Sequence, residues 1–291
     1  MPNSDEIHLP SFETVPPDFS LGSVFFVGTA TVLLRYAGFT ILTDPNFLHA
    51  GEPVYLGYGL TSERLTHPAL DIEALPPVDF CILSHYHGDH FDRIAEEKLS
   101  KALTIVTTNE AARALSGKGF TAPRALDTWK SVTLEKDGAR VKITSMPGRH
   151  GPPVVARLLP EVMGSLLEFQ PGEGGTALRL YITGDTLVFD GLKEIPKKFP
   201  EIDLALFHLG GTRIMGMLLT MDADQGVEAI RIIQPRQVIP IHYNDYTVFK
   251  SPLEDFKKAA ADAGFEDRVI YLGHGQLYNF EVPESRIRRA A

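Results

Sequence analysis

The segment His85-Tyr86-His87-Gly88-Asp89-His90 places three of the chain's ten histidines and one carboxylate within six residues. It directly follows residues 78–84, an apolar run that is typical of a β-strand. Imidazole and carboxylate groups are the ligands that zinc, manganese and iron share, so the segment predicts a metal site. Its first two histidines project the same way from an extended chain, while its aspartate and last histidine lie beyond a flexible glycine. One short loop can therefore offer two ligands to one metal ion and two to a neighbouring ion.

This segment has the HxHxDH form of the metallo-β-lactamase superfamily, and the chain resembles that superfamily over nearly its whole length. Members collect further ligands at the ends of later strands, and the chain offers a candidate at each such position. These candidates, in the expected order, are His150 after residues 141–146, Asp185 after residues 178–183 and His242 after residues 238–241. Upstream, Asp44 resembles the early aspartate that orients a ligand without binding metal. The resemblance implies an α/β fold, the αββα sandwich, and hydrolysis at two metal ions.

The resemblance also implies a role for each of these residues. One ion would be held by His85, His87 and His150, a second by Asp89, His90 and His242, and Asp185 would bridge the two. Two divalent ions held in this way bind a bridging hydroxide that acts as the nucleophile. Asp44 would accept the free N–H of a ligand histidine, and Asp89 would also carry a proton to the leaving group. The ligands suit Zn²⁺, Mn²⁺ and Fe²⁺, and we expect two zinc ions.

Within the superfamily, the sequence resembles the branch that contains ascorbate-6-phosphate lactonase and N-acyl-phosphatidylethanolamine phospholipase D. The residues that carry this likeness are 75–79 (LPPVD), 184–186 (GDT) and 240–243 (PIHY). The branch implies dinuclear hydrolysis but leaves the substrate open.

Composition narrows the class of protein. A formal net charge of −9 argues against a broad nucleic-acid surface, which needs clustered Lys and Arg. Cys81 is the only cysteine, so no internal disulfide is possible, and its apolar surroundings predict a buried structural thiol. Residues 1–20 show no signal-peptide pattern, and no apolar run reaches the length of a membrane span. We expect a cytoplasmic enzyme with a small-molecule substrate.

The periodicity predicts a mixed α/β chain with one domain over residues 1–291, preceded by an irregular tail over residues 1–20. Strands are expected at residues 23–27, 31–36, 39–43, 104–107, 131–135, 140–146, 162–169, 177–183, 204–207, 237–241, 269–272 and 276–280. Helices are expected at residues 92–100, 109–116, 222–233 and 252–263, with Asp92 as an N-cap. Residues 46–77 form a long loop, which is usually functional in a compact domain.

Two further residues could act on the substrate. His208 ends a predicted strand, as the ligands do, and is either a structural residue or a contact to substrate or a developing oxyanion. Tyr243 follows His242 directly and is a candidate oxyanion or proton donor.

Two loops beside the expected ligands are apolar. Residues 151–161 follow His150, and residues 213–219 follow His208 and contain two methionines. Together with Phe47, Leu48, Tyr55, Leu56 and Tyr58 of the long loop they predict an apolar pocket above the metals. The alternative is an interface between copies of the chain in a homo-oligomer, or small satellite cores.

Three classes of function remain open. A carboxylic ester or lactone hydrolase fits the apolar loops and is the favoured class. A phosphodiesterase fits the phospholipase-like sequence, but it needs cations near the metals, where Arg149, Arg157 and Arg213 are the candidates. A non-hydrolytic metal-binding or redox protein fits least, because di-iron members usually carry a carboxylate at the position of His87.

Overall fold

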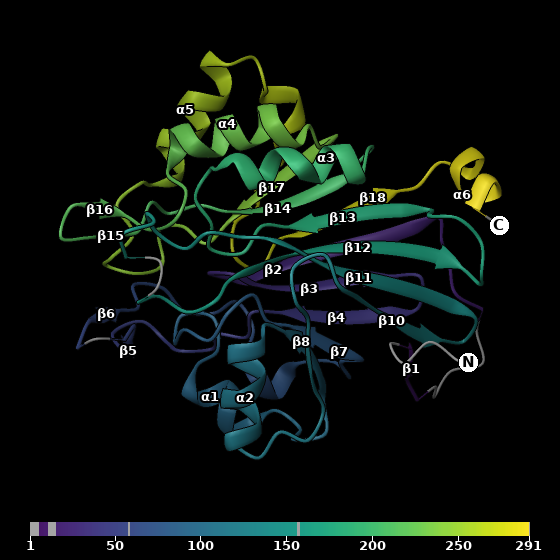
Figure 1. Ribbon diagram of the computed structural model, residues 1–291, viewed down its shortest axis with the longest axis horizontal. Helices are drawn as coiled ribbons and strands as arrows, with labels where there is room; N and C mark the ends of the chain where they lie inside the picture. The colour runs from purple at the N-terminus through teal and green to yellow at the C-terminus, as the bar shows by residue number, and fades with distance from the viewer. Residues whose placement is uncertain (1–5, 11–15, 58, 156–157, 291) are drawn as a thin grey trace.

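The computed structural model of the chain describes residues 6–10, 16–57, 59–155 and 158–290. Two seven-stranded β-sheets pack face to face, and helices cover their outer faces (Figure 1). Two short hairpins lie outside the sheets at one end of the molecule. The expected αββα sandwich is therefore confirmed.

The first sheet is built mainly from the first half of the chain and has the order β18-β2-β3-β4-β7-β8-β9. Its strands are β2 (Leu21–Gly28), β3 (Thr31–Tyr36), β4 (Phe39–Thr43), β7 (Phe80–Ile82), β8 (Thr104–Thr107), β9 (Pro123–Ala125) and β18 (Leu277–Glu281). β2, β3 and β4 form an antiparallel meander, and β4, β7, β8 and β9 run parallel. β18, from the C-terminal end of the chain, closes the edge beside β2.

The second sheet has the order β1-β10-β11-β12-β13-β14-β17. Its strands are β1 (Glu6–His8), β10 (Ser131–Lys136), β11 (Ala139–Pro147), β12 (Met163–Pro171), β13 (Leu178–Ile182), β14 (Leu204–His208) and β17 (Gln237–Ile241). β10 to β13 are antiparallel neighbours, whereas β13, β14 and β17 run parallel. The two small hairpins are β5 (Pro53–Tyr55) with β6 (Thr61–Glu63), and β15 (Arg213–Ile214) with β16 (Met217–Leu218).

Helices lie on the outer faces of both sheets (Figure 1). They are α1 (Arg93–Lys98), α2 (Asn109–Gly117), α3 (Glu194–Lys198), α4 (Ala223–Ile233), α5 (Leu253–Asp262) and α6 (Glu284–Ala290), with 3₁₀ turns η1 (Ile72–Ala74), η2 (Asp190–Lys193) and η3 (Glu266–Arg268). Side chains cap three of them, because Asp92, Thr108 and Asp222 accept the backbone N–H three residues later. No helix in the described part of the chain is long and apolar enough to cross a membrane.

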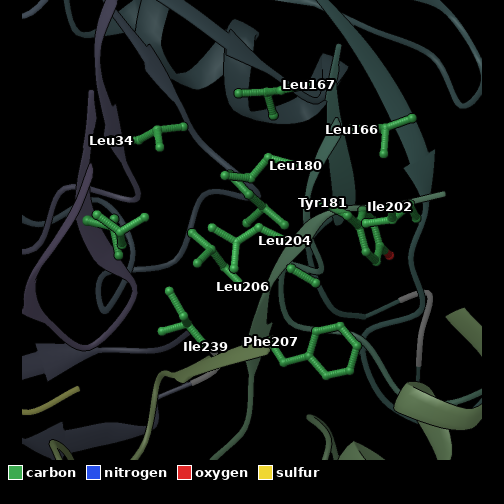
Figure 2. Close-up of a cluster of buried hydrophobic side chains, with 14 of the residues drawn as sticks. Leu34, Leu166, Leu167, Leu180, Tyr181, Ile202, Leu204, Leu206, Phe207 and Ile239 are labelled. Carbon is green, nitrogen blue, oxygen red and sulfur yellow. The ribbon is translucent and has the colours of Figure 1, made fainter. Parts of the chain in front are cut away.

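The largest hydrophobic cluster fills the space between the sheets and extends under α4 and α5. Leu34 of the first sheet lies across from Leu180 and Leu206 of the second, while Tyr181 and Phe207 point to the opposite face (Figure 2). Strand β14 is buried on both faces, which explains why residues 204–207 are apolar without alternation.

The structure corrects three expectations about secondary structure. Residues 269–272 form no strand, since only Val269 bridges to Val238 of β17. The N-terminal tail is not irregular throughout, because residues 6–8 pair with β10. Several short elements were not expected, among them β9, α3, α6 and both small hairpins.

Candidate metal centre

The predicted ligands meet at one edge of the sandwich. The strands β4, β7, β11, β13, β14 and β17 all end there, and each has a candidate site residue at its end or within a few residues after it. The His85–His90 segment follows β7 of the first sheet, while His150, Asp185 and His242 follow strands of the second. The site therefore lies where the two sheets meet.

His85, His87 and His150 form the first cluster. The Nδ1 atom of His87 lies 3.0 Å from Nε2 of His85 and 3.4 Å from Nε2 of His150. Two nitrogen ligands of one tetrahedral zinc ion are roughly 3.3 Å apart when each bond is about 2.0–2.1 Å. The three nitrogen atoms are thus spaced as ligands of a single ion.

Asp89, His90, Asp185 and His242 form the second cluster, in which every residue is buried. The Nε2 atom of His90 lies 3.1 Å from Nε2 of His242 and 3.4 Å from Oδ2 of Asp185. Oδ2 of Asp89 lies 3.5 Å from Nε2 of His242. The two clusters are adjacent. The centres of the His85 and His90 rings, one from each cluster, are 4.1 Å apart.

Backbone carbonyls set the tautomers of two ligands. His242 Nδ1 lies 3.1 Å from the Leu209 carbonyl oxygen, and His150 Nδ1 lies 3.1 Å from that of Leu219. A carbonyl only accepts, so each Nδ1 carries the hydrogen and each Nε2 turns its lone pair into the cluster. The position of Leu219 at the end of the 213–219 loop links this loop directly to a metal ligand.

Asp44 lies directly behind the second cluster, as expected from the sequence. Its Oδ2 atom is 3.3 Å from Nδ1 of His90 and 3.2 Å from Nε2 of His208, and its Oδ1 accepts the Ser84 N–H at 2.7 Å. Burial would raise the pKa of Asp44, but the charge of His90 and these hydrogen bonds outweigh burial and lower the pKa to about 2. Asp44 therefore stays ionised and orients the His90 ring.

The two clusters differ in electrostatics. Burial lowers the pKa of His85 well below its usual range and that of His87 to about 3, so the rings of the first cluster are neutral. Burial also acts on His90, but neighbouring carboxylates, Asp185 first, raise its pKa well above the usual value. A cation entering the second cluster would take the place of that proton.

The carboxylates of the second cluster fit a cation. Oδ1 of Asp89 and Oδ1 of Asp185 are buried, and neither has a hydrogen-bond partner among the described residues. Buried carboxylate oxygens without a donor are costly unless a positive charge faces them. The histidine and carboxylate set suits Zn²⁺, Mn²⁺ or Fe²⁺, so the residues present fit a divalent metal.

Four non-glycine residues near the site have left-handed backbone conformations. They are Thr29 (φ 51°), Asp44 (φ 35°), His242 (φ 61°) and Asn244 (φ 58°). Each such residue costs of order 1–3 kcal/mol, and such strain concentrates at functional sites. At Asp44 and His242 this backbone strain accompanies a conformation that directs the side chain toward the clusters.

His208 lies behind the second cluster, next to Asp44. Its side chain is fully buried, and its Nδ1 lies 3.2 Å from the Thr183 hydroxyl, which already accepts the His208 backbone N–H. The hydroxyl therefore donates to Nδ1, and Nε2–H donates to Asp44. Of the two interpretations that the sequence left open, these contacts favour the structural one, in which His208 holds Asp44 in place.

Tyr243 does not lie where the sequence suggested. Its hydroxyl donates to the Leu272 carbonyl oxygen at 2.8 Å, and its ring packs on Phe26. The expectation of an oxyanion or proton donor at the metals is therefore wrong.

The arginines proposed to meet an anionic substrate have other partners. The Arg149 guanidinium lies 4.4 Å from the centre of the Phe189 ring, and Arg213 pairs with Asp222 at 3.0 Å. Arg157 lies outside the described residues.

The apolar loops are partly where the sequence placed them. Val154 is 81% exposed, Leu158 56% and Met215 92%, and the β15–β16 hairpin lies at the metal edge of the molecule (Figure 1). Phe47, Leu48 and Leu56, which were expected to line the pocket, are buried in hydrophobic clusters instead. Tyr55 is exposed, and Tyr58 lies outside the described residues.

Comparison with known proteins agrees with this geometry. The profile of the beta-lactamase superfamily domain matches residues 40–243, which include all seven candidate ligands. The chain belongs to the metallo-β-lactamase superfamily. A metal-dependent hydrolase of Methanosarcina mazei is 29% identical over 238 residues, covering 81% of this chain and 96% of the relative. One from Nanoarchaeum equitans is 29% identical over 209 residues, covering 68% and 85%.

Solved structures share the fold of this superfamily member. An isothiocyanate hydrolase from Delia radicum gut bacteria has a TM-score of 0.74 at 20% identity and covers 89% of this chain and 100% of its own. A possible metal-dependent hydrolase from Veillonella parvula has a TM-score of 0.74 at 20% identity and covers 90% and 99%. The chain is a hydrolase of the metallo-β-lactamase superfamily whose His/Asp clusters are able to bind metal.

Sequence reasoning missed several residues that support the clusters. Asn46, Arg64 and Tyr246 form a buried group next to the metal-binding segment, and Ser84 and Thr183 contact the orienting residues. Asn46 could have been suspected from its place two residues after Asp44. Nothing local distinguishes Arg64 from the other arginines of the sequence.

Proposed function

We propose that the protein is a dinuclear metal-dependent hydrolase that acts on carboxylic esters or lactones with an apolar group. The observation that carries the dinuclear centre is the pair of adjacent clusters, each with at least three ligand atoms within 4.8 Å of one another. Zinc is the favoured ion because it accepts both histidine-only and mixed histidine–carboxylate sets.

In the proposed mechanism the first cluster would hold one ion through His85, His87 and His150. The second would hold the other through Asp89, His90 and His242, with Asp185 between them. When bound, the ions would lower the pKa of water at the site and polarise the scissile carbonyl group.

The protein's own residues then hold and orient the reacting groups. Asp44 keeps His90 in one tautomer, and the carbonyls of Leu209 and Leu219 do the same for His242 and His150. Among the ligands of the first cluster only His87 is partly exposed, so substrate approaches past His87. Asp89, two residues further along the segment, is the proposed carrier of a proton to the leaving group.

The substrate class rests on the rim of the site. Arg213 is already paired with Asp222, and the Arg149 guanidinium is stacked on the Phe189 ring, so the described residues supply no paired cations for a phosphodiester. The exposed side chains of Val154, Leu158 and Met215 offer apolar surface instead. An anionic phosphodiester needs paired cations, whereas an acyl chain needs apolar contact.

A matched substrate panel tests this proposal. An aryl ester, a lactone and a bis-phosphodiester of similar size are compared by kcat/KM on the zinc-loaded protein. An alkyl isothiocyanate is included because a fold neighbour carries the name isothiocyanate hydrolase. We expect the ester or lactone to exceed the phosphodiester by at least roughly tenfold.

The second candidate is a phosphodiesterase of the phospholipase D-like or nucleotide type, which the branch resemblance and Arg157 favour. If the phosphodiester is cleaved fastest and Arg157→Ala abolishes that activity, this candidate replaces the ester hydrolase. A redox function is tested by metal analysis with a visible spectrum. A cytoplasmic location and a homo-oligomeric state remain predictions.

A further inference from the structure

Arg64 has an unusual environment for a charged residue. It follows β6, its side chain is fully buried, and it is the bulkiest such side chain among the described residues. In that part of the chain no carboxylate lies within 4.0 Å of its guanidinium group, whereas the partly buried Arg286 pairs directly with Asp203. The charge of Arg64 is felt by the buried Asp245 on the far side of Thr66, and burying a guanidinium in this way is favourable only where well-placed hydrogen bonds hold it.

The first contact leads to the metal-binding segment. Arg64 Nη1 donates to Oδ1 of Asn46, which also accepts the Tyr246 hydroxyl at 3.0 Å. With its oxygen held by two donors, the amide has one orientation, and Nδ2 donates to the Gly88 carbonyl oxygen at 3.0 Å. Gly88 separates His87 of the first cluster from Asp89 of the second. A Cβ atom at Gly88 would lie 2.8 Å from the Tyr55 carbonyl oxygen, so the segment is held on its other side by β5.

The second contact leads toward the last ligand. Arg64 Nε donates to the Thr66 hydroxyl at 3.3 Å, and this hydroxyl donates to Oδ1 of Asp245 at 2.5 Å. Asp245 Oδ2 accepts the Thr29 N–H at 2.6 Å, and the Thr29 carbonyl accepts the His242 N–H at 2.5 Å. This route therefore ends at the backbone of a second-cluster ligand.

The remaining nitrogen of Arg64 lies against the same turn. Nη2 has no hydrogen-bond partner among the described residues, and a Cβ atom on Gly28 would lie 2.9 Å from it. Gly28 has φ 145° and precedes Thr29, so a glycine here gives the guanidinium its space.

We propose that Arg64 is a positioning residue of the metal centre, which holds Asn46 against the Gly88 carbonyl and packs under the Gly28–Thr29 turn that supports His242. This inference rests on the proposed function, because it concerns the ligands of that centre. Arg64 contacts neither substrate nor metal in this role. It acts by fixing the distance between the segment after β7 and the ligand after β17.

The test uses the full-length protein and the variant Arg64→Met, which keeps bulk but removes the donors. Zn²⁺ affinity is measured by competition with a chromophoric chelator, and Co²⁺ alone is added to record the visible spectrum. Outer-shell partners typically change metal affinity by about 10–100-fold, and we expect a loss in that range with an altered Co²⁺ spectrum. Unfolding of the metal-free protein is recorded in parallel.

Arg179→Met is the matched control. Arg179 pairs with Glu168 at 2.9 Å and lies near the start of β13, at the end of the strand opposite the site. We expect this variant to lose stability while Zn²⁺ affinity and the Co²⁺ spectrum stay as in the wild type. If Arg64→Met and Arg179→Met lost Zn²⁺ affinity equally, the proposal would be overturned, because the loss would then reflect general destabilisation of the fold.

Asn46→Ala provides the second arm and carries the test alone if Arg64→Met does not fold. It should weaken Zn²⁺ binding in the same direction, and the double variant should be weaker by less than the product of the two single effects. Unchanged affinity and spectrum in Asn46→Ala, or fully multiplicative losses, would overturn the proposal. A wild-type protein that binds no metal would instead contradict the proposed function, so the two failures are distinguishable.

Discussion

The floor of the site and its rim are built in opposite ways. The floor consists of the seven candidate ligands, which follow strands, are almost all buried and have ring orientations fixed by hydrogen bonds. The rim, the described residues of 151–161 and 213–219, carries apolar side chains that are more than half exposed. Among the described residues, the hydrogen bond from His150 to the Leu219 carbonyl ties this rim to the floor.

This difference separates chemistry from selectivity. Atoms at strand ends are held by both sheets, so their spacing is set by the fold and resists change. Exposed loop side chains are held by few contacts and can be replaced at little cost in stability. A substitution in the floor should therefore act on metal binding, and one in the rim on substrate preference.

The largest effect is expected for Asp185→Ala. The protein should hold close to two equivalents of metal, as a two-metal hydrolase does, and the variant should lose at least one because Asp185 is the proposed bridge. Elemental analysis after gel filtration measures this, and activity on the best substrate should fall to the background rate. If the variant retained both ions, Asp185 would not be the bridging ligand.

Asp44→Asn should have a smaller effect on the same floor. The amide keeps one acceptor oxygen, so either the Ser84 N–H or both ring donors, from His90 and His208, are left opposite an NH₂ group. We expect metal affinity or turnover to fall by about 10–100-fold with the fold intact. The measurements are turnover at limiting metal and circular dichroism. Unchanged turnover would show that Asp44 is only a turn residue before Pro45.

A substitution in the rim should change how KM depends on the length of the acyl chain of the substrate. Met215→Asp should raise KM for long acyl esters more than for short ones, because each buried methylene contributes about 0.8 kcal/mol, or about fourfold in binding. KM is measured for a series of esters of increasing acyl-chain length, and the slope of log KM against chain length is compared between variants. Leu21→Asp is the control, since Leu21 is 55% exposed at the start of β2, away from the metal edge. The same slope in wild type and Met215→Asp would exclude the hairpin from the substrate site.

The floor could be predicted from the sequence because the chain resembles the metallo-β-lactamase superfamily, whose ligands come soon after strands. His85, His150, Asp185 and His242 were identified by this resemblance, and the structure brings them together. A place at the end of a strand did not settle the role of His208, which is bonded to Asp44. Position in the sequence does not tell which of two buried directions a side chain takes.

The long loop before β7 shows the second limit of sequence reasoning. Phe47 and Leu48 were expected in a pocket, but the carboxylate of Asp92 accepts their backbone N–H groups and draws them into the core. Arg64 was overlooked because its role depends on contacts with residues 46 and 246, far from it in the chain. Apolar character predicts burial, but it does not predict which neighbours a loop residue meets.

The origin of the ligands from both sheets has a consequence for how the enzyme matures. The first cluster needs His85 and His87 from one sheet and His150 from the other, and the second combines Asp89 and His90 with Asp185 and His242. Neither half of the chain holds a complete cluster, so an ion cannot nucleate folding as it does in a zinc finger. Synthesis must pass residue 242 before the second cluster exists, and the sheets must dock before either cluster is complete. On the proposed function, metal loading would therefore follow the docking of the two sheets, and metal-free protein would accumulate when metal is scarce.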